Sequence, residues 1–200
     1  MKLYLSNTSP YGRLCLTRAY LLGLNDLQLV FTDPWQNPPE LEAKNPFSQI
    51  PVLETDSGEI IYNSLLICQY WENGRVTSAE GLNLIGYAMA LLDNAISAFK
   101  LEKKTGESRE HFLVKRNLEA IARALPHVPT FAADSREWPQ VMLGVCLLTV
   151  KLRYPEIFDG HARSDTQTAL AAFAQQPFVV QTNPDVLGET LPATIGDIPA

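Results

Sequence analysis

The chain has 200 residues, a length that suits one large domain or two small ones. Its 16 basic and 22 acidic side chains give a net charge of −6, which makes a nucleic-acid partner unexpected because such sites gather lysine and arginine. With 46% hydrophobic residues the chain can build a core, yet no apolar run reaches the roughly 18–20 residues that span a bilayer. The N-terminus has no signal-peptide core, so we expect a soluble, cytoplasmic protein with no membrane partner.

The first part of the chain alternates strand and helix signals, and short apolar or alternating runs separated by turn residues mark its strands. The predicted elements are a strand over 2–5, a helix over 13–22, a strand over 27–32, a proline-rich loop over 33–39, and strands over 50–54 and 59–62. A helix follows the last strand and is expected to be capped by Ser64 and to end at Trp71.

The second part shows no convincing strand. Apolar residues at helical spacing predict helices over 81–104, 110–125, 141–152 and 165–175. The tail after Pro177 is rich in proline and glycine and is expected to be coil. With residues 73–78 as the linker, the sequence predicts an α/β domain over 1–75 and an all-helical domain over 79–200.

Cysteine and histidine do not form a metal or disulfide motif. Cys15, Cys68 and Cys146 are widely spaced, lack a CxxC pair and lie among apolar residues, so we interpret them as small buried side chains. The three histidines share no metal-ligand spacing. We therefore expect no metal site.

Four segments, in this order and spacing, carry a family resemblance. They are Ser9-Pro10-Tyr11-Gly12-Arg13, the run Asn45-Pro46-Phe47-Ser48-Gln49-Ile50-Pro51-Val52-Leu53, Gly58 with Asn63-Ser64, and Leu91-Leu92-Asp93-Asn94. Together they make the chain, up to about residue 178, resemble a cytosolic glutathione S-transferase of the bacterial type with a Ser-Pro-Tyr-Gly-Arg active-site loop. The resemblance implies an N-terminal thioredoxin-like β-α-β-β-β-α domain, followed by a C-terminal helical bundle that contributes to the electrophile pocket.

Ser9 is the candidate catalytic residue. It lies between a strand and a helix N-terminus, where free N–H groups and the helix dipole favour an anion. Ser9 and Gly12 stand where a thioredoxin-like CPYC motif has its cysteines, so this loop cannot form a mixed disulfide, but a hydroxyl can donate a hydrogen bond to a thiolate. A plain helix cap is the alternative role, and Thr8 or Ser6 could contact the thiolate instead.

The resemblance also implies the remaining glutathione contacts, which are Gln49, Ile50, Pro51, Asn63 and Ser64. The Ile50–Pro51 bond is expected to be cis, with Ile50 pairing its backbone with the cysteinyl part of glutathione, while Ser64 receives the γ-glutamyl carboxylate. The family usually has Glu, Gln or Asp before this serine. The neutral Asn63 forms weaker bonds to the ligand's ammonium than a carboxylate would, and it suggests reduced affinity.

A pocket for a small hydrophobic electrophile is expected between the domains, with Tyr11, Trp35, Tyr87 and Asn94 in its walls. Each of these side chains could instead be ordinary core packing. The sequence does not identify the electrophile.

The leading hypothesis is therefore a glutathione S-transferase for detoxification, a homodimer that needs no cofactor beyond glutathione as co-substrate. The alternative is a binding or regulatory protein that keeps the fold without catalysis. Asn63 favours this alternative slightly. So does the pair Glu137 and Gln140, which stands where the family usually has a Ser/Thr-x-x-Asp helix cap. A thiol–disulfide oxidoreductase is disfavoured, since the nearest thiol, Cys15, lies well into the helix.

Overall fold

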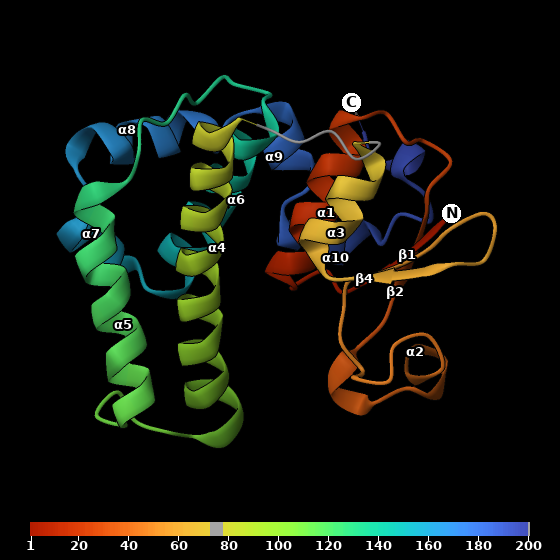
Figure 1. Cartoon of the computed structure of the whole chain (residues 1–200), viewed down its shortest axis with the longest axis horizontal. Helices are drawn as coiled ribbons and strands as arrows, with labels where there is room; N and C mark the ends of the chain where they lie inside the picture. The colour runs from red at the N-terminus through yellow and green to blue at the C-terminus, as the bar shows by residue number, and fades with distance from the viewer. Residues whose placement is uncertain (73–77, 200) are drawn as a thin grey trace. The chain divides into compact units, whose positions relative to one another are not determined.

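The structure, a computed structural model, describes residues 1–72 and 78–199 (Figure 1). The chain forms two compact units: Met1–Val76 with Pro177–Ala200, and Thr77–Gln176. Of the linker predicted over residues 73–78, only Ser78 lies within the described residues; its Oγ accepts a hydrogen bond from Gly81 N at 3.1 Å and caps the next helix.

A four-stranded mixed sheet forms the centre of the first unit. Its strands are β1 (Lys2–Leu5), β2 (Gln28–Phe31), β3 (Val52–Glu54) and β4 (Ile60–Tyr62), in the order β2-β1-β3-β4. Strand β1 runs parallel to β2 and antiparallel to β3, and β4 completes the sheet beside β3. With helices α1 (Pro10–Leu21) and α3 (Ser64–Trp71), this confirms the predicted thioredoxin-like domain.

The two faces of the sheet are covered by different helices. Tyr4 and Val52 pack against Leu41 of α2 (Pro39–Glu42) on one face. Neighbouring residues of a strand point to opposite faces, so Leu3 and Leu53 belong to the other face, where α1 and α3 lie side by side (Figure 1).

The loop predicted over residues 33–39 contains two short helices, η1 (Pro34–Gln36) and α2. Asp33 caps the first, accepting a hydrogen bond from Trp35 N at 3.0 Å, and each helix has proline in its first turn. Proline is favourable at that position because it lacks only an N–H that a helix start leaves unpaired.

The second unit is helical, and the four predicted helices are confirmed with shifted ends. Helix α6 is buried along most of its length and packs on α4, which in turn packs on α5. The short α7, which begins at Pro155, was not predicted. The elements are α4 (Ala79–Lys100), the π-helix η2 (Leu101–Thr105), α5 (Phe112–Ala124), η3 (Leu125–His127), α6 (Trp138–Arg153), α7 (Pro155–His161) and α8 (Ser164–Phe173).

The continuous helical stretch Ala79–Thr105 is long and apolar enough to cross a membrane, judged by length and composition only. Polar residues interrupt this stretch, so it was not predicted from apolar runs alone. The core helix of a soluble protein passes the same test, and Leu84, Leu91 and Leu92 of α4 are buried within the second unit.

The tail was expected to be coil and part of the helical domain, and the structure corrects both expectations. It forms α9 (Pro177–Gln181), α10 (Pro184–Thr190) and η4 (Ile195–Asp197), and it groups with the first unit. Phe178, Leu187 and Ile195 are buried there. Two of the tail prolines, Pro177 and Pro184, stand in the first turns of α9 and α10, where proline fits a helix.

Gly144 of α6 provides a test of packing in the second unit. A Cβ added there would lie 2.5 Å from two ring atoms of Phe173, closer than any normal contact. We expect Gly144→Ala to lower the free energy of unfolding by about 1–3 kcal/mol through overpacking. Gly86→Ala in α4, where an added Cβ meets nothing within 4 Å, should instead raise it by up to about 1 kcal/mol. Equilibrium denaturation of both variants checks this, and equal shifts would contradict it.

Candidate functional site

The register of the sheet brings the predicted glutathione segments to one edge. Tyr4, near the end of β1, pairs with Val52 at the start of β3, and Val52 pairs with Tyr62 at the end of β4. This edge of the sheet is formed by strand ends and not by an outer strand. It adjoins three segments: the loop to Ser9, the Ile50–Pro51 bond and the Asn63-Ser64 pair. Strand β2 ends there too, because Leu5 pairs with Phe31, so the segment leading to Trp35 starts beside them.

Ser9 is the N-cap of α1. Its Oγ accepts a hydrogen bond from Gly12 N at 3.1 Å, and its own N–H donates to Ser6 O at 3.2 Å. The cap bond uses a lone pair of the hydroxyl and leaves its proton available to an acceptor. The side chain is half-buried, whereas Thr8 is exposed at the corner of the turn. The structure thus shows the cap, and the thiolate contact of Ser9 stays a prediction.

The backbone before β3 is held by a residue to which the sequence analysis gave no role. Asn45 is buried; its Nδ2 donates to Gln49 O at 2.9 Å and its Oδ1 accepts from Phe47 N at 3.1 Å. These bonds fix the turn that leads to Ile50, whose side chain packs on the cluster of Tyr4 and Leu41. The motif Asn-Pro ahead of Ile-Pro could have suggested this role, since asparagine side chains commonly bond to nearby backbone.

The predicted cis bond between Ile50 and Pro51 is confirmed. Pro51 is buried, Ile50 is half-buried and Gln49 is exposed. Gln49 contributes its carbonyl to the bond with Asn45, so the structure assigns a local role to its backbone, and its contact with glutathione stays a prediction.

At the start of α3 the structure corrects the predicted cap. The N-cap is Asn63, whose Oδ1 accepts from Leu65 N at 3.0 Å, and Ser64 is the first helical residue. Asn63 has φ 83° and ψ 121°, a positive φ that is uncommon for residues other than glycine. Ser64 is buried, and its carbonyl accepts a hydrogen bond from Cys15 Sγ at 3.7 Å. Because Asn63 makes the cap, the Ser64 hydroxyl is not needed for it.

The residues predicted for the electrophile pocket divide between the two units. Tyr11 and Trp35 belong to the first, and Tyr87 and Asn94 belong to α4 in the second. Tyr87 donates its hydroxyl to Ala124 O at 2.6 Å, and Asn94 donates to Ala90 O at 2.7 Å, so both side chains also have local structural bonds. Burial raises the pKa of the Tyr87 hydroxyl. A pocket formed by all four stays a prediction.

The thiols are confirmed as buried, and Cys15 lies inside α1 with no exposed surface. Burial raises its pKa well above the usual value, aided by a hydrogen bond with Cys68. A thiol needs exposure and a low pKa to react, so Cys15 is a poor candidate for disulfide exchange. Within residues 1–72 and 78–199 no three potential ligands from histidine, cysteine or carboxylate gather to hold a metal ion.

At the start of α6 in the second unit, Glu137 is the N-cap but its side chain makes no cap bond. Gln140 does not complete a capping box. Its amide bridges the preceding segment, accepting from Ala132 N at 3.1 Å and donating to Thr130 O at 3.3 Å. The N-cap is therefore at the expected residue with altered bonding, and the helix begins at Trp138, before the predicted start at residue 141.

Comparison with known proteins identifies the N-terminal segment. Residues 8–73 match the family model "glutathione S-transferase, N-terminal domain". No curated protein sequence matches the chain significantly.

Solved structures resemble most of the chain. A glutathione transferase family member from Pseudomonas fluorescens Pf-5, with bound glutathione, has a TM-score of 0.78 and 20% identity over 92% of this chain and 98% of that chain. A glutathione S-transferase from Methylobacillus flagellatus KT, with glutathione bound, gives 0.72 and 20% over 92% and 98%. Glutathione transferase F7 from Populus trichocarpa gives 0.67 and 16% over 92% and 98%. The chain therefore has the glutathione transferase fold, and its residues 8–73 match the N-terminal domain of that family.

Proposed function

We propose that this protein is a glutathione S-transferase that holds glutathione as a thiolate beside Ser9 and conjugates it to a small hydrophobic electrophile. The observation that carries the proposal is a pair of serines, Ser9 and Ser64, at the N-termini of α1 and α3 beside one sheet edge. Both lie in the segment that matches the glutathione S-transferase N-terminal domain. The solved structures with glutathione bound have the same fold and support the same ligand.

The two helix N-termini are suited to two of the anionic groups of glutathione, the γ-glutamyl carboxylate and the thiolate. At α3, the Ser64 hydroxyl and the first N–H groups of the helix can receive the γ-glutamyl carboxylate, which the helix dipole favours. At α1, Ser9 accepts its cap bond from Gly12 N and can donate its proton to the thiolate. Between them, Ile50 offers backbone N–H and C=O to the cysteinyl residue.

Simple energetics show why the hydroxyl is needed. A free thiol has a pKa of about 8.5, so half ionisation at pH 7 requires roughly 2 kcal/mol of stabilisation. The helix N-terminus typically supplies about 0.3–1 kcal/mol. A hydrogen bond to a charged group adds about 1.5–3 kcal/mol. The dipole alone is therefore insufficient, and the dipole with the Ser9 hydroxyl is sufficient.

Ser9→Ala tests this role against plain capping. It should raise the pKa of the bound glutathione thiol by at least about one unit, which lowers the thiolate fraction at neutral pH about tenfold. Ser78→Ala is the matched control, since Ser78 Oγ caps α4 with the same 3.1 Å bond that Ser9 makes on α1. Both should lose about 0.5–2 kcal/mol of stability.

The measurement is thiolate absorbance of bound glutathione against pH. If the Ser9→Ala and Ser78→Ala curves coincide, Ser9 is only a cap, and Thr8 or Ser6 becomes the candidate.

Asn63 is neutral, so it should bind the ligand's ammonium more weakly than a carboxylate at this position would. Aspartate caps helices as well as asparagine does, so Asn63→Asp should keep the cap on Leu65 N while adding charge. Charge-assisted bonds are roughly twice as strong as neutral ones, and we expect about tenfold tighter glutathione binding by calorimetry. Asn183→Asp is the control, because Asn183 Oδ1 caps α10 with the same 3.0 Å distance. Equal affinities in both variants would remove Asn63 from the site.

The alternative function is a glutathione-fold binding or regulatory protein without catalysis. It is favoured by Asn63, which is neutral and whose side-chain oxygen already accepts the bond that caps the helix. Retention on a glutathione column separates ligand binders from bare scaffolds, and turnover of a chlorodinitrobenzene-type electrophile separates enzymes from binders. Retention without turnover would support the alternative.

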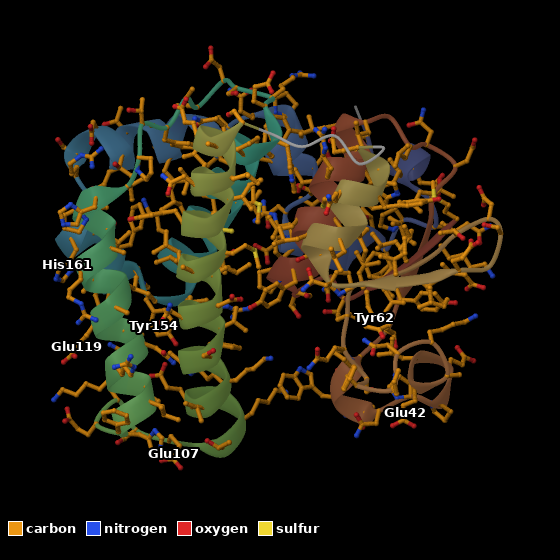
Figure 2. All side chains as sticks on the ribbon, viewed as in Figure 1. Glu42, Tyr62, Glu107, Glu119, Tyr154 and His161 are labelled. Carbon is orange, nitrogen blue, oxygen red and sulfur yellow. The ribbon has the colours of Figure 1, made fainter. Side chains whose placement is uncertain are left out.

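We also propose a homodimer, supported by exposed aromatic residues in the first unit. Phe47 is 67% exposed and Tyr62 is 42% exposed, and their rings meet edge to face at 6.4 Å (Tyr62 is labelled in Figure 2). Leu66 and Tyr70 continue the exposed apolar face along α3 at four-residue spacing. A second copy of the chain would remove this surface from water.

Sedimentation at micromolar concentration should therefore give twice the chain mass of 22.2 kDa. Phe47→Lys should shift the protein toward monomer, because a charge buried at an interface is costly. Leu22→Lys changes an exposed leucine at the C-cap of α1 and should leave the dimer intact. A monomer in the unmodified protein would refute the dimer.

A further inference from the structure

The turn that leads into Ser9 is in close contact with the C-terminal segment. Ser9 N donates to Ser6 O, which closes a turn with Asn7 and Thr8 at its corner. The side-chain amide nitrogen of Asn7, Nδ2, lies 2.8 Å from the position that a Cβ of residue 188 would occupy. Residue 188 is a glycine within α10, and the Asn7 side chain can therefore rest directly against the α10 backbone.

Gly188 is not required by the backbone. Its φ is outside the left-handed region, and alanine is favoured over glycine inside a helix. A methyl group at this position would meet Nδ2 at the end of the Asn7 side chain.

Helix α10 is itself firmly placed on the first unit. Buried Arg13 of α1 donates to Val179 O at 3.0 Å, and the Thr17 and Thr182 hydroxyls are hydrogen-bonded at 3.1 Å. On the other side, Thr194 forms a β-bridge with Gln28 of β2. The C-terminal segment is thus attached to the unit before and after α10, so the surface that meets Asn7 is fixed.

We propose that Asn7 and Gly188 are positioning residues, through which α10 sets the orientation of the Ser6–Ser9 turn and hence of the Ser9 hydroxyl. The proposal rests on the proposed function for its effect on the thiolate. It also makes a claim about the turn that holds without a ligand. Neither residue need touch glutathione.

Gly188→Ala tests the contact without changing charge. The new methyl group would take the space of the Asn7 Nδ2 atom, so the end of this flexible side chain must move aside and lose its contact with α10. Loss of the contact should loosen the turn before Ser9 and lower the thiolate fraction of bound glutathione on the order of tenfold at neutral pH. Gly160→Ala is the control, since Gly160 also lies in a seven-residue helix and an added Cβ there meets nothing within 4 Å. Melting temperatures of both variants should be unchanged or higher.

A double-mutant cycle assigns the effect to the contact. In an Asn7→Ala background, where the amide is gone, Gly188→Ala should cause no further loss of thiolate. An equal loss in both backgrounds would overturn the role of Asn7. An unchanged titration in Gly188→Ala alone would overturn the proposal.

Hydrogen exchange of the ligand-free protein separates this proposal from the proposed function. The Ser9 and Gly12 amides, which donate to Ser6 O and Ser9 Oγ, should exchange faster in Gly188→Ala and not in Gly160→Ala. Faster exchange in a protein that fails to bind glutathione would refute the proposed function and leave the positioning role intact. Unchanged exchange would overturn the positioning role whatever the ligand.

Discussion

The pairing of Val52 with both Tyr4 and Tyr62 is the constraint on which the site and the core of the first unit depend. It aligns the end of β1, the start of β3 and the end of β4, and so it brings two helix N-termini and the Ile50–Pro51 segment to one edge. Because side chains alternate along a strand, a slip of one residue would turn Val52 away from Leu41 and the cluster beneath α2. Burial on both faces of the sheet therefore protects the alignment of the site.

At the α3 N-terminus, structural and chemical tasks fall to adjacent residues. Asn63 has a positive φ and caps the helix, so the cap does not require the hydroxyl of Ser64. At α1 one residue does both, since the Ser9 oxygen accepts the cap bond while its proton stays available. Because Ser9 has both tasks, any displacement of Ser9 affects the start of α1 as well as the candidate thiolate contact.

Local patterns predicted the local structure well. Short apolar or alternating runs located the four strands, and helical spacing located α4, α5, α6 and α8. Proline was misinterpreted as a sign of loop or coil at Pro39 and Pro184, which stand in the first turns of helices. The motifs named the segments of the site but could not show the strand register that joins them, and residues as distant as Asn7 and Gly188 carry no signal of contact in a single sequence.

Arg13 shows why the C-terminal segment belongs to the fold of the first unit. Its guanidinium is buried, and among the described residues its Nε has no hydrogen-bond partner. Burial lowers its pKa to about 10, opposed by the charge of Asp185, so it remains a cation at neutral pH. Burying a charge is costly unless it is well paired, and an apolar residue of similar size is often at least as stable. What the arginine adds is direction, because its N–H meets the Val179 carbonyl and fixes α9 at one place on α1. With α9 bonded there and Thr194 bridged to β2, the segment that holds α10 is attached to the first unit on both sides of this helix.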